Sequence, residues 1–148
     1  MEIDKFPIGQ TLTAVSIIED KEDGGDRLSI DKVQLFFQDT SVTLLPIADT
    51  DEVEILIQTA TLPAVADTPF WCQSLIGKKL MTVWVCDNDQ GYRDQVIFAF
   101  EYLHPSITFV AECSSLLVFL CEPVCRVKSV TDLQLLSGAS GLNVFSHC

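Results

Sequence analysis

Two stretches of this chain, residues 8–56 and 76–121, repeat one pattern of apolar, glycine and acidic positions in the same order. The spacing between matching positions is 68 residues at first, then 63, then 65, and it changes where loops are expected. Loops tolerate changes of length that strands do not. The matching positions are Ile8 with Ile76, Gly9 with Gly77, Leu12 with Leu80, Val15 with Val83, Asp31 with Asp94, Val33 with Val96, Phe37 with Phe100, Ser41 with Ser106, Thr43 with Thr108 and Val53 with Val118. The pattern therefore predicts an internal duplication.

Each copy is predicted to open with a short helix and to continue as four strands. Apolar and polar residues alternate in most of the strand segments, which is the period of a half-buried strand. The predicted helices are Met1–Ile8 and Pro69–Leu75, and the predicted strands are Leu12–Glu19, Asp31–Gln38, Ser41–Ile47, Val53–Gln58, Leu80–Cys86, Asp94–Leu103, Ser106–Ala111 and Leu116–Cys121. We expect a mainly β protein, bordering on α+β, in which two tandem β-meanders form one sheet, an open barrel or a sandwich.

A length of 148 residues suits one domain, residues 1–148, with one core. About fifty residues would be marginal as an independent unit, so the two copies are expected to pack together. Between them we expect a linker over residues 59–67. A C-terminal extension is expected over residues 124–148.

The second copy is more apolar than the first. Its segments Ile97–Phe100 and Leu116–Cys121 are apolar on both faces, which indicates that something covers both faces. The cover is the other copy, the C-terminal segment or a second subunit. We predict a homodimer with Asp94–Leu103 or Leu116–Cys121 near the interface.

The net charge of −12 argues against binding to nucleic acid or to an anionic membrane, since both need clustered basic residues. A basic protein partner is compatible with it. The start of the sequence lacks the basic and apolar regions of a secretory signal, and the longest apolar run, Ile107–Cys121, is too short to span a bilayer. These features predict a cytoplasmic protein whose six cysteines are thiols.

The acidic segment Asp20–Asp31 is the sharpest candidate for a metal site. It carries acidic residues at its first, third and twelfth positions and glycine at its sixth, like a calcium loop, although strands rather than helices are expected on both sides. Its counterpart in the second copy is Asp87–Asp94. The candidate ligands are Asp20, Glu22, Asp31, Asp87 and Asp89. The favoured alternative is that both segments are solvated hairpin loops.

One region resembles a known group of proteins. The run DKVQLFF at Asp31–Phe37, SVTL from Ser41 and DTDEVEI at Asp49–Ile55 are similar to small bacterial, often cyanobacterial, proteins of unknown function. The resemblance implies no activity.

No cofactor motif or catalytic arrangement is recognisable, so no cofactor is predicted. The sequence favours a non-catalytic binding protein, such as an acidic inhibitor or immunity-type protein. The alternative is an enzyme that is metal-dependent or acts on a small ligand, with its pocket between the repeats.

Overall fold

The computed structural model describes residues 3–19, 27–59 and 67–126. They form two short 3-10 helices and eight strands. In chain order these are η1 (Ile3–Lys5), β1 (Ala14–Glu19), β2 (Ser29–Phe36), β3 (Thr40–Ile47), β4 (Glu52–Thr59), η2 (Phe70–Leu75), β5 (Leu80–Asp87), β6 (Arg93–Phe100), β7 (Ile107–Glu112) and β8 (Ser115–Leu120). The prediction of a mainly β protein is confirmed, and each predicted strand is found with its ends shifted by at most three residues.

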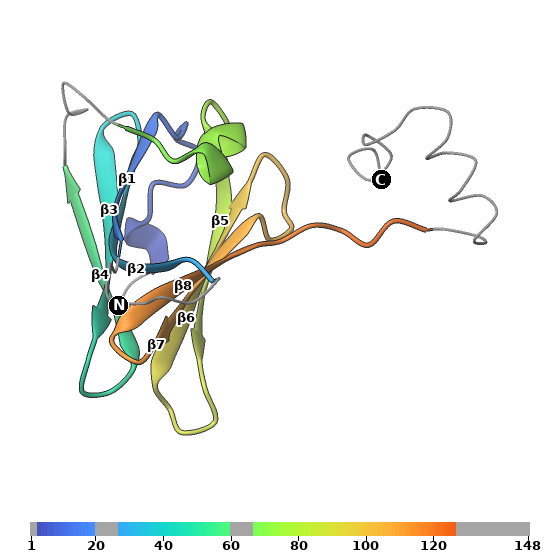
Figure 1. Ribbon diagram of the computed structural model, residues 1–148. Coiled ribbons are helices and arrows are strands. Elements are labelled where there is room, and N and C mark those ends of the chain that lie inside the picture. Colours follow the sequence, from blue (N-terminus) through green and yellow to red (C-terminus); the bar gives the residue numbers. More distant parts are fainter. Residues whose placement is uncertain (1–2, 20–26, 60–66, 127–148) are drawn as a thin grey trace.

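The strands form two antiparallel meanders, β1–β4 and β5–β8, within one eight-stranded sheet. The meanders are joined where Ser29 and Ile30 of β2 pair with Leu117 and Leu116 of β8. The sheet curls at this junction, so that the first meander, drawn in blue to green, lies opposite the second, drawn in yellow-green to orange (Figure 1). Of the three expected arrangements, a single curled sheet is the one observed.

The first three strands of the two meanders pair in the same register. Val15 of β1 lies opposite Leu35 of β2, and the positions 68 and 63 residues further on, Val83 and Phe98, lie opposite each other in β5 and β6. Likewise Val33 and Leu44 pair between β2 and β3, and Val96 and Phe109 pair between β6 and β7. Residues that were matched by their spacing in the sequence therefore occupy equivalent positions in the hydrogen-bonded ladders of the two meanders.

The fourth strand follows a different spacing from the one predicted. Val53 lies opposite Pro46, and the residue in the same place in the second meander is Leu116, opposite Ala111. The spacing there is 63 residues, so the predicted match of Val53 with Val118 is wrong by two residues. A shift of two keeps every side chain on its own face, and alternation alone does not detect it.

Reciprocal backbone hydrogen bonds join the segments that lead into β1 and β5. The amide of Gly9 donates to the carbonyl of Leu80, and the amide of Gly77 donates to the carbonyl of Leu12, both at 2.8 Å. Gly9 and Gly77 have φ angles of 88° and 87°, in the region that favours glycine. Each glycine thus turns the chain from a 3-10 helix toward the first strand of its own meander and contacts the other meander.

The same ladder continues through the residues between these ends. Leu12 donates its amide proton to Lys78 at 3.0 Å, and Leu80 donates to Gln10 at 2.9 Å. These bonds flank an isolated bridge between Thr11 and Lys79. Exchanging the matched residues leaves the set of four bonds unchanged, as a local two-fold axis between the meanders would require.

One hydrophobic core is built from both meanders. Phe37 and Phe100, at matching positions, stack with ring centroids 6.3 Å apart and ring planes 9° apart. Phe98 makes edge-to-face contacts with Phe6 at 6.1 Å and with Phe109 at 5.9 Å. Aromatic pairs of this geometry add to the free energy gained by area burial.

Three local expectations are corrected. Both short helices are 3-10 helices. The hydroxyl of Thr68, just before η2, accepts a hydrogen bond from the Val15 amide at 3.2 Å. Strand β6 ends at Phe100, three residues before the predicted Leu103, because Glu101 has a φ of 70°. Cys72, Cys86, Cys113 and Cys121 are thiols as expected, but Cys125 is disulfide-bonded.

Candidate functional site

The predicted metal ligands do not gather into a site within the described part of the chain. Asp20 and Glu22 lie outside the described residues. Asp31 is exposed on β2, while Asp87 and Asp89 are exposed at the end of β5 and in the following turn. No group of three or more metal-ligating side chains is present among the residues the structure describes. The metal site stays a prediction, because two of its five ligands are not described.

The β5–β6 hairpin has a structural use for its polar residues. The side-chain oxygen of Asn88 accepts hydrogen bonds from the amides of Gln90 at 2.9 Å and Tyr92 at 3.1 Å. The Asn88 side-chain amide donates to the Asp94 carboxylate at 3.3 Å. Asparagine often closes turns in this way. Asp94 therefore supports the turn through the side chain of Asn88.

The acidic run Asp49–Ile55 also has a structural use. Its Asp51 accepts a hydrogen bond from the amide of Cys113 at 3.1 Å, and Glu52 accepts one from the amide of Arg93 at 3.2 Å. Both acceptors belong to the β3–β4 hairpin, and both donors belong to the second meander. These two carboxylates hold the meanders together at the end away from the glycine ladder.

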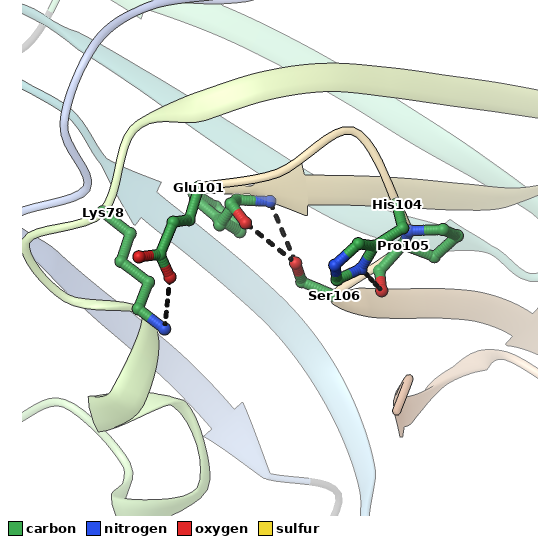
Figure 2. Close-up of polar contacts among 6 residues, drawn as sticks. Lys78, Glu101, His104, Pro105 and Ser106 are labelled. Carbon is green, nitrogen blue, oxygen red and sulfur yellow. Dashed lines mark hydrogen bonds and ion pairs between the residues drawn. The ribbon is translucent and has the colours of Figure 1, made fainter. Parts of the chain in front are cut away.

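The turn between β6 and β7 carries a second polar group (Figure 2). Lys78 forms an ion pair of 3.1 Å with Glu101, and both side chains are more than a third exposed. The hydroxyl of Ser106 accepts a hydrogen bond from the Phe100 amide at 2.9 Å, and His104 contacts the carbonyl of Pro105 at 3.4 Å. Ser106 and His104 are each held by backbone groups rather than by each other. They do not form the bonded nucleophile and base that covalent catalysis needs.

The outer face of the second meander is apolar. Trp84, Ile97, Thr108 and Phe119 lie side by side in one row across β5, β6, β7 and β8. The neighbouring row consists of Cys86, Gln95, Val110 and Leu117. We call these eight residues the apolar face. They point away from the core residues of the same strands, such as Val83, Phe98 and Leu116.

Large side chains on this face are open to solvent. Trp84 is 37% exposed and Phe119 is 46% exposed, and they stand at the two margins of their row. Ile97, next to Trp84 in that row, and Val110 in the neighbouring row are partly buried, whereas Thr108 and Leu117 are buried, each 6% exposed. A contiguous apolar patch on a protein surface is typical of an interaction site.

Four of the eight matching positions in the first meander are polar or charged, while Ile18, Leu45 and Leu56 are apolar at three others and Thr43 matches Thr108. The register places Ser16 where Trp84 stands, Lys32 where Gln95 stands, Gln34 where Ile97 stands and Glu54 where Leu117 stands. The first meander packs against the same core with polar side chains at these positions. Core packing therefore does not require the apolar residues of the second meander.

The sequence alone pointed to three of the eight residues of this face. The segments Ile97–Phe100 and Leu116–Cys121 were predicted to be apolar on both sides, and their residues Ile97, Leu117 and Phe119 lie on the apolar face. Trp84 and Val110 were not assigned to it. Their strands contain apolar residues at consecutive positions, so the sequence offers no alternation that says which residue faces outward.

A separate cleft of about 470 Å³ lies beside β1. Its lining comes from β1 and from the segment just before η2, and includes Glu19, Asp67 and Pro69.

The chain belongs to a family of unknown function, DUF6334, whose model matches residues 1–125. No curated protein and no solved structure matches the chain. Within the described residues, no helix has the length and hydropathy needed to cross a membrane.

Proposed function

We propose that this chain is a bacterial, cytoplasmic, non-catalytic interaction module, and that the apolar face of its second meander is its binding surface. The observation that carries the proposal is the difference between the outer faces of the two meanders. Four apolar or uncharged residues replace Ser16, Lys32, Gln34 and Glu54 at matching positions. A protein gains nothing in solution from a solvated Trp84 or Phe119, whereas burial against a partner would release water from them.

An internal duplication is part of the same proposal. It is supported by the shared register, by the reciprocal bonds of Gly9 and Gly77, and by the stacking of Phe37 on Phe100. Two copies of one unit would begin with the same outer face. The two copies then diverged at four outer positions, which are Ser16, Lys32, Gln34 and Glu54 in the first copy and Trp84, Gln95, Ile97 and Leu117 in the second.

A binding role is favoured over catalysis by the state of the reactive side chains. Ser106 and His104 are held by backbone groups. Burial raises the pKa of the Cys72 thiol from 9.0 to about 11, which keeps it protonated and unreactive at neutral pH. The net charge of −12 favours an acidic inhibitor or immunity-type protein as the form of this function, since it would speed association with a basic protein.

The proposal is tested first by stability. Phe119→Lys is expected to lower the free energy of unfolding by about 1 kcal/mol or less, since the lysine stem replaces part of the lost contact and its amine reaches water. Leu116→Lys, three residues earlier in the same strand at a fully buried position, is expected to cost more than about 3 kcal/mol. Chemical denaturation measures both. If Phe119→Lys costs as much as Leu116→Lys, the face belongs to the core and the proposal fails.

The second candidate is a small-ligand or metal-dependent enzyme, and the cleft beside β1 is the feature that favours it. Glu19 and Asp67 give this cleft a negative lining suited to a cationic ligand. A calcium-dependent rise in melting temperature, described in the Discussion, would support it.

A further inference from the structure

We infer that the apolar face is covered by a second copy of this chain, packed through the same face, so that the protein is a two-fold homodimer. This inference rests on the proposed function, because it identifies the partner of that binding surface. It does not depend on the identity of any other protein.

The chemistry of the face limits what can cover it. None of its eight residues is charged, although the chain as a whole carries a net charge of −12. A charged side chain buried against this face would lose its hydration and gain no partner, which is strongly unfavourable. The covering surface must therefore be uncharged and apolar over a patch of similar size.

The chain offers one surface of that kind on its two outer sheet faces. The matching face of the first meander carries Lys32 and Glu54, and these charges exclude it as the cover. The apolar face itself satisfies the requirement. Contact between two copies of one patch is the isologous arrangement of a two-fold dimer.

The positions of the large side chains suit this arrangement. Trp84 and Phe119 stand at the two margins of their row, with Ile97 and Thr108 between them. A two-fold axis parallel to the strands brings Trp84 of one copy against Phe119 of the other at both margins. Ile97 and Thr108 then meet in the middle, as in the aligned packing of two sheets about 10 Å apart.

The area of the apolar face determines the expected affinity of the dimer. Four strands spaced by about 4.8 Å, each contributing two outward residues over roughly 13 Å of length, make a patch on the order of 250 Å² on each copy. This is about a third of the usual contribution of about 800 Å² per partner to a stable interface. The dimer is therefore expected to be reversible in the micromolar range. Its affinity should rise with added salt, which screens the repulsion between two negatively charged copies.

Sedimentation equilibrium of the full chain tests the inference. The mass should rise from 16.4 kDa toward twice that value between low micromolar and several hundred micromolar concentrations. Phe119→Lys should stay monomeric over the whole range, because the interface would bury a charge against an apolar surface. Leu56→Lys is the matched control: Leu56 is 37% exposed at the matching place in the first meander, and its substitution should leave the dimer intact.

Fluorescence of Trp84 shows whether the apolar face is covered and whether the cover depends on protein concentration. The chain has two tryptophans, so a Trp71→Phe background leaves Trp84 as the only one. In the dimer, acrylamide should quench Trp84 less as the protein concentration rises. A monomer whose Trp84 is quenched freely at all concentrations would overturn the second copy as partner but leave the face available for another protein.

Two other results would also overturn the inference. A monomer whose Trp84 is shielded at every concentration would mean that a segment of the same chain covers the face, and the proposed function would fail as well. A dimer that persists in Phe119→Lys would place the interface elsewhere.

Discussion

Alanine at the two matched glycines is the most direct test of the relation between the meanders. Gly9 and Gly77 have φ angles of 88° and 87°, and no atom lies within 4 Å of the Cβ that alanine would add at either position. The cost of substitution is therefore confined to the backbone. An L-residue in this conformation loses about 1 to 2 kcal/mol. We expect Gly9→Ala and Gly77→Ala each to lower the free energy of unfolding by about that amount.

The two substitutions should also be coupled. Each glycine donates its amide proton into one shared ladder, Gly9 to Leu80 and Gly77 to Leu12. A shift of the backbone at one glycine disturbs the acceptor strand that leads from the other. The double variant should therefore cost less than the sum of the single variants by at least about 0.5 kcal/mol, as for other residues that share a network.

Gly91→Ala provides the matched control. Gly91 has a φ of 87° and equally open surroundings, but it lies in the β5–β6 hairpin and outside the shared ladder. Its substitution should cost a similar amount and be additive with Gly77→Ala. Urea denaturation at equilibrium gives all the required free energies. The two-fold relation would be refuted if the losses of unfolding free energy in Gly9→Ala and Gly77→Ala differ by more than about 1 kcal/mol. It would also be refuted if these two losses add as completely as those of Gly77→Ala and Gly91→Ala.

Two further predictions concern pH and calcium. Cys72 is 1% exposed, and burial raises its pKa from 9.0 to about 11. As the pH rises, its thiol therefore ionises in the unfolded chain before it does so in the folded protein. Stability should be unaffected by this group below pH 9 and should fall between pH 9 and 11 by on the order of 2 kcal/mol, and Cys72→Ala should lack this part of the decline in alkaline denaturation curves. Calcium chloride should raise the melting temperature no more than sodium chloride at matched ionic strength, because the acidic loops are predicted to be solvated and only screening applies. A larger calcium effect that Asp20→Asn and Asp87→Asn abolish would make the metal-dependent enzyme the leading function.

The strands were predictable because their signal is local. Alternation of apolar and polar side chains records which face of a strand meets the core, and Val53, Ile55 and Ile57 of β4 illustrate it. Gly9 and Gly77 lie at the turns that lead toward β1 and β5, and the reason is equally local, since a positive φ favours glycine. The prediction that Val53 and Val118 occupy equivalent positions was wrong because a shift of two residues preserves the alternation. Only the hydrogen-bonded ladder distinguishes the two registers.

The parts of the candidate site that were missed depend on contacts between distant residues. Nothing near Asp51 or Glu52 in the sequence indicates that their carboxylates accept amide protons from Cys113 and Arg93. An aromatic residue in a strand is usually buried, so the sequence around Trp84 does not indicate an outer position. Its position on the outer face follows from its pairing with Ile97, which is a property of the sheet.

The two meanders differ more at outer positions than at core positions. Core positions such as Leu12 and Leu80 are the same in both, since each is fully buried and a change of size there is costly. Outer positions are under no such constraint, and those of a solvated sheet normally hold polar residues, as Gln34 and Glu54 do in the first meander. Ile97 and Leu117 at the matching positions depart from that tendency together and in one direction. A common cause that acts on these neighbouring positions, namely contact with another apolar surface, accounts for the departure, whereas the packing of the core, which both meanders share, does not.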